Sequence, residues 1–350
     1  MTEALPPHGL VPIQSDPFNA ETPLRLLDQA ATPVAQFYVR NHFPVPSLPA
    51  GAWRLAIDGA VARPRELSLA ELQALPVQTL GVTLECAGNG RSCLTPPPPG
   101  VRWGYGAIGS ARFTGTPLWR VLDGAVPAPD VVEILCAGAD AGTLSDGRHT
   151  AYLRSLPLEV ARHPDTLLAW AMEGEPLTAN HGAPVRLVVP GWYGMASVKW
   201  LVGLSARRRP FEGYFQTEHY TAQGEAGVPD GTPLSRIRVR SVIASPPEGA
   251  ILEQGAVEIA GTAWSGAGEI RQVETSTDGG HQWMPASLSP PLASYLATPW
   301  RCTWRPPGPG AYTIMARARD AAGGVQPLEP VWSRLGYGNN AVQRVRVTVR

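Results

Sequence analysis

The sequence predicts an α+β domain with a mixed sheet, followed by an all-β sandwich. A length of 350 residues suits two domains. The composition, with 44% hydrophobic and 17% charged residues, is globular, and 37 glycines and 37 prolines indicate many turns and little helix. The hydrophobic pattern also changes along the chain: short apolar runs alternate with brief helical patterns up to about residue 207, and strict alternation follows from about residue 237.

The predicted elements follow in order. Residues 1–35 are rich in proline and weakly patterned, and we expect an extended arm on the surface. The first domain, at residues 36–230, has a capping box in which Ser68 is the N-cap and Glu71 the third helical residue, so a short helix should begin there. Two further helices are expected at 118–122 and 158–161, and strands at 55–57, 77–84, 131–135 and 185–189.

The second domain is predicted at residues 231–350. Its apolar residues alternate at 238–243, 257–261, 312–318 and 344–349, and turn sequences separate these runs at 246–249, 278–280 and 306–310. Alternation with one buried face per strand is typical of an antiparallel sandwich.

One cysteine lies where a ligand can reach it. Cys86 follows the strand predicted at 77–84 and precedes Gly88-Asn89-Gly90, whose glycines allow positive φ and a close backbone approach to a ligand. Arg91 adds a positive charge that favours the thiolate. The alternative is a buried structural cysteine beside a turn, because free cysteines are often buried.

Lys199 is the only lysine, so 28 of the 29 basic residues are arginine. An ammonium is a compact point charge that suits a phosphate or another anionic oxygen. A compositional accident is the alternative interpretation.

The sequence shows no pattern typical of several classes of partner and cofactor. The formal net charge is zero, so neither nucleic acid nor an anionic membrane is an expected partner, and no apolar run approaches the roughly 20 residues of a membrane span. The four cysteines form no CxxC pair, haem attachment sequence or iron–sulfur cluster pattern, so electrons must leave to an external acceptor. No export signal is visible, which predicts a cytoplasmic protein, or a periplasmic one if an upstream signal was removed.

Four motifs in register resemble the sulfite oxidase family of molybdenum-cofactor enzymes, specifically a bacterial member without a haem domain. They are the Cys-Ala-Gly-Asn-x-Arg motif at 86–91, and the segments at 37–42, 103–109 and 181–200. The resemblance implies a molybdenum-cofactor domain followed by an immunoglobulin-like dimerisation domain, whose characteristic hairpin matches residues 276–283. It also implies that Cys86 is the only protein ligand of molybdenum, with molybdopterin supplying the other sulfurs.

The same resemblance assigns roles to other residues. Arg40 and Arg91 match positions that line the anion pocket, Trp103 matches a third, and Tyr220 lies 21 residues after Lys199, as the family's active-site tyrosine does. Gly194 and Met195 match backbone contacts to the cofactor, and Asp140 is an expected acceptor for the pterin amino groups. The remaining residues expected to bind the cofactor are Asn41, His42, His181, Arg186, Ser197 and Lys199.

The expected function is oxidation of a small anion, sulfite, to sulfate by a homodimer that passes electrons to a cytochrome c-like protein or to oxygen. Two departures from the family weaken the case for sulfite: Leu335 stands where animal and plant enzymes carry a third anion-binding arginine, with Arg334 one residue away, and Pro99 replaces a further basic residue. One alternative is a molybdenum-dependent reductase of an oxo-anion or sulfoxide. Another is a non-catalytic binding protein built on the β-sandwich.

Overall fold

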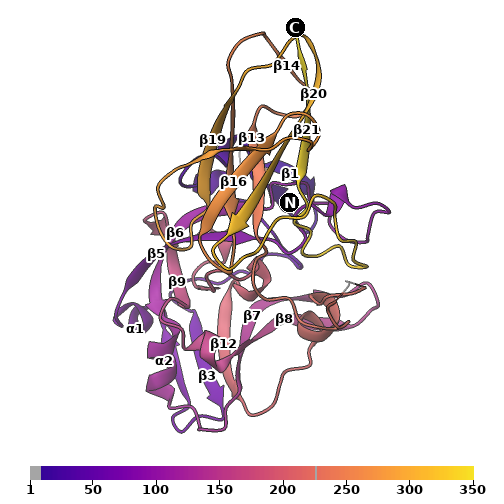
Figure 1. Cartoon of the computed structure of the whole chain (residues 1–350). Helices are drawn as coiled ribbons and strands as arrows, with labels where there is room; N and C mark the ends of the chain where they lie inside the picture. Colours follow the sequence, from indigo (N-terminus) through magenta and orange to yellow (C-terminus); the bar gives the residue numbers. More distant parts are fainter. Residues whose placement is uncertain (1–8, 225–226) are drawn as a thin grey trace.

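The computed structural model describes residues 9–224 and 227–350. Figure 1 shows a long β-sandwich, coloured orange to yellow, at one end of the molecule, and a domain of mixed sheets and short helices at the other. Both parts of the predicted fold class are therefore confirmed.

Two sheets form the first domain. One has the order β10-β9-β6-β5, with β11 paired to β9; the other has the order β4-β3-β12-β7-β8, in which β12 runs parallel to β3 and antiparallel to β7. The strands of the first sheet are β5 (Gln78–Glu85), β6 (Ile108–Pro117), β9 (Leu167–Met172), β10 (Glu175–Pro176) and β11 (Arg186–Val188). Those of the second are β3 (Arg54–Gly59), β4 (Arg65–Ser68), β7 (Glu133–Thr143), β8 (His149–Pro157) and β12 (Leu201–Arg207).

The helices are short, as the glycine and proline content predicts. The capping box is present: Glu71 N donates to Ser68 Oγ over 3.3 Å, and Ser68 N donates to Glu71 Oε2 over 2.8 Å. The α-helices are α1 (Leu69–Gln73), α2 (Leu118–Ala125) and α3 (Leu158–Ala161). Single helical turns are η1 (Leu24–Leu26), η2 (Val34–Gln36), η3 (Arg91–Cys93), η4 (Ala179–His181) and η5 (Gly194–Ala196), and η6 (Phe215–His219) is a π-helix. No helix in the described part of the chain is long and apolar enough to cross a membrane.

The N-terminal segment differs from the expected surface arm. Of the part that is described, β1 (Val11–Gln14) and β2 (Asn19–Glu21) form a hairpin, and β2 is wholly buried. Ala20 exchanges backbone hydrogen bonds with Val39, and Thr22 N donates to Gly106 O over 2.9 Å. Strands this short carry no readable alternation, so these long-range bonds, not the local pattern, build the segment into the domain.

Glu21, at the end of β2, predicts a pH dependence of stability. Burial raises the pKa of this carboxyl from 4.5 to about 7, against the opposing effect of nearby backbone N–H groups at Gly104 and Gly106. The folded state therefore keeps the proton to a higher pH than the unfolded chain. The free energy of unfolding should fall as the pH rises from 4.5 to about 7. The full loss is roughly 3 kcal/mol, at about 1.4 kcal/mol per pKa unit.

The Glu21→Gln variant cannot ionise here. Between about pH 4 and pH 8, its free energy of unfolding should therefore rise by roughly 3 kcal/mol relative to wild type, as measured by urea unfolding. Glu258→Gln is the control: its side chain is 60% exposed beside Arg301, and surface pairs contribute at most about 1 kcal/mol. A difference between Glu21→Gln and wild type that stays constant with pH would refute the prediction.

The second domain consists of two packed sheets, with orders β13-β15-β19-β18 and β14-β21-β20-β16-β17. The strands of the first are β13 (Arg240–Ser245), β15 (Val257–Trp264), β18 (Ser287–Leu288) and β19 (Thr298–Trp304). Those of the second are β14 (Ala250–Leu252), β16 (Ile270–Ser276), β17 (Met284–Pro285), β20 (Gly310–Asp320) and β21 (Gln343–Val349). The expected hairpin is present, because β16 ends and β17 begins on either side of a turn in which Asp278 accepts backbone N–H groups of His281 and Gln282.

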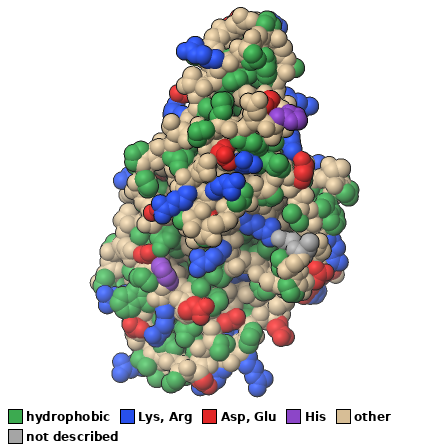
Figure 2. Space-filling model, in the orientation of Figure 1, with side chains coloured by type: hydrophobic (Ala, Val, Ile, Leu, Met, Phe, Trp, Pro, Cys, Tyr) green, Lys and Arg blue, Asp and Glu red, His purple; other side chains and the backbone are tan. Residues whose placement is uncertain are grey.

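The two domains share part of their core. Val242, Trp264 and Tyr337 from the second domain pack in one hydrophobic cluster with residues of the first. Thr83 N also donates to Tyr295 O over 2.9 Å, which joins β5 to the sandwich. On the face drawn in Figure 2, basic and acidic side chains are interspersed, as the zero net charge suggests.

Candidate active site

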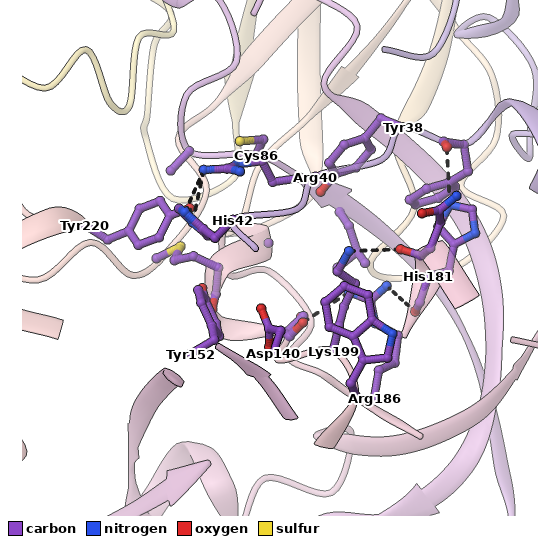
Figure 3. Close-up of a pocket in the computed structure, with 18 residues that line it drawn as sticks. Tyr38, Arg40, His42, Cys86, Asp140, Tyr152, His181, Arg186, Lys199 and Tyr220 are labelled. Carbon is purple, nitrogen blue, oxygen red and sulfur yellow. Dashed lines mark hydrogen bonds between the residues drawn. The ribbon is translucent and has the colours of Figure 1, made fainter. Parts of the chain in front are cut away.

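A pocket lined by residues of the motifs at 37–42, 86–91 and 181–200, and by Asp140, Tyr152 and Tyr220, lies in the first domain. Figure 3 shows that its polar side chains form two groups: Cys86, Arg40, His42 and Tyr220 lie on one side, and His181, Arg186 and Lys199 on the other. The "thiol side" and the "cation side" below are these two groups.

Cys86 is placed by the end of β5. Its N–H donates to Ala107 O over 2.9 Å, its carbonyl oxygen accepts from Asn89 N over 2.9 Å, and only 5% of the residue is exposed. Burial raises the pKa of the thiol, and Arg40 is the strongest of the cations that oppose this effect, ahead of Arg91. The sequence predicted that the charge of Arg91 favours the thiolate. In the structure Arg40 and Arg91 both do so, and a bound metal cation would displace the proton from the sulfur.

His42 connects Arg40 with Tyr220. The His42 Nε2 to Tyr220 Oη distance is 2.6 Å, and Arg40 Nη2 lies 2.9 Å from Nδ1. Burial, reinforced by Arg40, holds the pKa of His42 well below its usual value, so the imidazole is neutral. Arg40 Nη2 also lies 3.1 Å from Nε2, so the tautomer of the neutral ring decides whether His42 or Tyr220 donates in the contact between them. With the ring proton on Nε2, Tyr220 keeps its own proton for a ligand in the pocket.

Three basic residues define the cation side. Lys199 Nζ donates to Asn180 O over 2.9 Å and to Asn41 Oδ1, and it lies 4.2 Å from the centroid of the Trp200 ring. Burial lowers the pKa of Lys199 well below its usual value and that of Arg186 to about 10. Burial likewise lowers the pKa of His181 to about 3.

The bonds of the cation side show which groups are free for a ligand. His181 has both ring nitrogens in contact with the protein, at 2.8 Å from Thr178 Oγ1 and 3.3 Å from Phe37 O. Arg186 donates to the carbonyl oxygens of His181 and Ser197, each over 3.1 Å. Ser197 Oγ accepts from Val189 N over 3.0 Å, which leaves the hydroxyl proton to donate. Direct ligand contacts are therefore easiest for Lys199 and Ser197.

Asp140 is the acid that lines the pocket. Burial raises its pKa to about 6, against the opposing charge of Lys199. Its Oδ1 is buried and has no hydrogen-bond partner among the described residues. A buried acceptor without a donor is costly, so this oxygen suits a ligand that brings N–H groups.

A glycine lets the 194–196 turn approach the pocket. A Cβ at Gly194 would lie 2.7 Å from Tyr38 Oη, so a side chain there would displace the tyrosine. Met195 presents its carbonyl oxygen to Tyr152 Oη over 2.8 Å. Both residues line the pocket, and their backbone contacts to a cofactor stay a prediction.

Three predicted residues lie outside the pocket lining. Arg91 donates from Nε to Leu335 O over 3.1 Å and from Nη1 to Val101 O over 2.9 Å. Trp103 is fully buried in the cluster that contains Cys86, and its Nε1 has no partner among the described residues. Asn41 contacts the site through Lys199. Their roles toward substrate and cofactor stay predictions.

The pocket also contains residues that sequence reasoning missed. Tyr38, Asn180 and Trp200 lie within or beside the motifs at 37–42 and 181–200, so their neighbours gave a signal. Tyr152, on β8, had none, because it reaches the pocket through the β7–β8 pairing.

These groups fit a molybdenum cofactor. The cation side offers buried basic groups for a phosphate. The negative charge of the phosphate would stabilise their charged forms and so raise the pKa values that burial lowers. Asp140 offers an acceptor for amino groups, and Cys86 is the thiol that lines the pocket. A soft thiolate suits a metal that also takes sulfur from a dithiolene.

Comparisons with known proteins agree with this chemistry. Residues 42–215 match the family model of the oxidoreductase molybdopterin binding domain, and residues 232–350 match that of the Mo-co oxidoreductase dimerisation domain. Human mitochondrial sulfite oxidase is 37% identical over 354 residues, which cover 95% of this chain and 64% of the human protein. The chain thus spans about two thirds of that relative's length.

Two further relatives are covered more fully. Sulfite oxidase of Arabidopsis thaliana is 32% identical over 94% of this chain and 91% of the plant protein. The crystal structure of the sulfane dehydrogenase SoxCD from Paracoccus pantotrophus superposes with a TM-score of 0.82 at 28% identity, covering 98% of this chain and 85% of that chain. The chain belongs to the sulfite oxidase family of molybdopterin oxidoreductases.

Proposed function

We propose that this protein oxidises sulfite to sulfate at the thiol side of the pocket and passes the electrons to an external acceptor. The observation that carries the proposal is the grouping of Cys86, Arg40, His42 and Tyr220 around one space, with separate cations for a phosphate on the other side (Figure 3). The sulfite oxidases among its relatives support this substrate.

The overall reaction balances as sulfite plus water giving sulfate, two protons and two electrons. The molybdenum cofactor, when bound through Cys86, supplies the two-electron redox step and the oxygen transfer. The chain's own residues bind and orient the anion. Arg40 provides a fixed positive charge beside Cys86, where an oxyanion gains a charge-assisted hydrogen bond.

Tyr220 is the hydrogen-bond donor in this proposal. Burial raises its pKa to about 12, so the hydroxyl stays protonated at physiological pH. In this proposal the His42 proton is on Nε2, so that His42 donates to the Tyr220 oxygen and the Tyr220 proton can donate to an oxygen of the bound anion. Arg40 and Tyr220 together would bind and orient sulfite beside Cys86.

We further propose a homodimer formed through residues 232–350, which match a dimerisation domain. The electron acceptor in this proposal is a cytochrome c-like protein or oxygen. Size-exclusion chromatography with light scattering measures the oligomeric state, and reduction of cytochrome c against consumption of oxygen distinguishes the acceptors.

The function is tested by a metal assay and by sulfite-dependent reduction of an artificial acceptor. We expect about one molybdenum per chain and turnover that depends on sulfite. A loaded protein that instead oxidises a reduced dye upon addition of an oxo-anion or a sulfoxide would favour the reductase. A purified protein that takes up no molybdenum would favour the non-catalytic alternative.

Leu335 predicts weak sulfite binding. Its side chain is partly buried against the core, and Arg334 points elsewhere, since its guanidinium donates to Gln223 Oε1. A charge-assisted hydrogen bond contributes roughly 1.5–3 kcal/mol, or about ten- to hundredfold in affinity. The Leu335→Arg variant should therefore lower the KM for sulfite by about tenfold or more.

The KM values are compared only for variants that are folded and metal-loaded, because an unpaired buried charge at position 335 would itself destabilise the protein. Leu335→Met preserves the volume and adds no charge, so its KM should equal that of wild type. An unchanged or higher KM in loaded Leu335→Arg protein would mean that another cation already fills this role, or that the substrate is not a sulfur oxyanion.

A further inference from the structure

The turn that carries Cys86 is held by the second domain. Gly338 N donates to Ala87 O over 2.8 Å, and Asn339 Nδ2 donates to Gly90 O over 2.8 Å. Arg91, at the end of the turn, donates from Nε to Leu335 O over 3.1 Å. Residues 335–339 thus cover the turn along its length.

Glu85, the residue before Cys86, receives a second set of contacts. Arg240 Nη1 donates to Glu85 Oε1 over 3.0 Å, and Trp264 Nε1 donates to Oε2 over 2.8 Å. Asn89 Nδ2, from the turn itself, also donates to Oε1, over 2.9 Å. The side chains of Arg240 and Glu85 are only 1% and 2% exposed. Donors from both domains therefore satisfy a carboxylate that water barely reaches.

The sandwich presents these two donors together. Arg240 begins β13, Trp264 ends β15, and the two residues are directly opposite in the antiparallel pairing. Residues opposite one another project from the same face of a sheet, so both side chains reach the same carboxylate.

The cysteine turn is shaped to receive Arg240. Gly90 has φ 81°, and a Cβ there would lie 2.5 Å from Arg240 Nη2. Arg240 Nη1 also donates to Asn89 O over 3.1 Å. Arg240 therefore contacts residues on both sides of Cys86, and a side chain at position 90 would exclude it.

We propose that the second domain positions the Cys86 sulfur, and that Arg240 and Trp264 are positioning residues that act through Glu85. Fixing Glu85 and Asn89 fixes the backbone on either side of the sulfur, which is what a single thiolate ligand requires. The domain then has a role in the site in addition to dimerisation. This inference rests on Cys86 being the reactive residue of the pocket, and it is independent of which substrate the enzyme oxidises.

Trp264→Phe tests the proposal with a small change, because it removes the N–H donor and keeps an aromatic ring. Trp300→Phe is the matched control: Trp300 lies in β19 of the same sheet and is also buried, but its Nε1 has no partner among the described residues. The double variant Glu85→Gln/Arg240→Met removes the ion pair without leaving a buried charge unpaired.

The measurement is the alkylation rate of each cysteine in the native full chain, resolved by peptide mass spectrometry, with and without bound cofactor. Cys136, fully buried on β7, reports general opening of the first domain. We expect the ratio of the Cys86 rate to the Cys136 rate to rise about tenfold in Trp264→Phe and at least as much in the double variant. Trp300→Phe should leave it at the wild-type value.

Three results would overturn the proposal. The first is a ratio at the wild-type value in both test variants, and the second is an equal rise in Trp300→Phe. The third is an equal acceleration of both cysteines, which would show a purely structural role. None of these measurements involves sulfite, so a failure here is distinct from a failure of the proposed activity.

Discussion

We expect the Cys86→Ser variant to lose turnover while keeping its fold and its oligomeric state. A serine hydroxyl is a harder and more basic ligand than a thiol, so it does not replace a thiolate at a soft metal centre. The change is nearly isosteric, and the contacts between the cysteine turn and residues 335–339 use the Ala87 and Gly90 carbonyl oxygens and the Arg91 side chain, so the substitution keeps these contacts with the domain at 232–350. Turnover, metal content and size-exclusion elution of the variant are measured together.

Cys93→Ser is the matched control, because Cys93 is exposed at the end of the same turn and does not line the pocket. Its turnover should equal that of wild type. Wild-type activity in Cys86→Ser would show that the thiolate is not needed and would remove the basis for the cofactor site as described.

Local patterns predicted the elements that local interactions make. The capping box placed the start of α1, because Ser68 and Glu71 form it from residues three positions apart. Alternation predicted β13, β15, β20 and β21, but only β21 alternates between buried and exposed residues along its whole length, whereas β13 and most of β15 are buried on both faces. The hairpin of β1 and β2 was missed, because its burial depends on Val39 and Gly106, far along the chain.

In the candidate site, too, local sequence signals identified some residues, whereas others are brought together only by the tertiary structure. Cys86 and Lys199 could be identified, because one lies in a glycine-rich turn and the other is the only lysine. The partners that tune them could not: His42 and Tyr220 are 178 residues apart, and Glu85 and Arg240 are 155 apart. A sequence gives residue types at these positions, whereas the pairing of sheets and domains decides which of them meet.

Lys199→Ala should lower cofactor occupancy more than turnover per bound metal. Lys199 lies on the cation side of the pocket, where burial lowers its pKa well below the usual value and an anionic phosphate would restore the charged form. Loss of one charge-assisted hydrogen bond weakens binding by about ten- to hundredfold. We therefore expect a low ratio of molybdenum to protein after purification and near wild-type turnover for the chains that retain the metal.

Lys199→Arg separates charge from shape. A guanidinium keeps the positive charge but needs room for its planar fork, and the ammonium here fits between Asn180 O and the Trp200 ring. Occupancy of Lys199→Arg should accordingly lie between those of Lys199→Ala and wild type. Thermal unfolding of the cofactor-free proteins shows whether the variants remain folded. If Lys199→Ala kept the wild-type ratio of molybdenum to protein but had reduced turnover, the prediction would be wrong. The Lys199 ammonium would then act on the substrate and not on the cofactor phosphate.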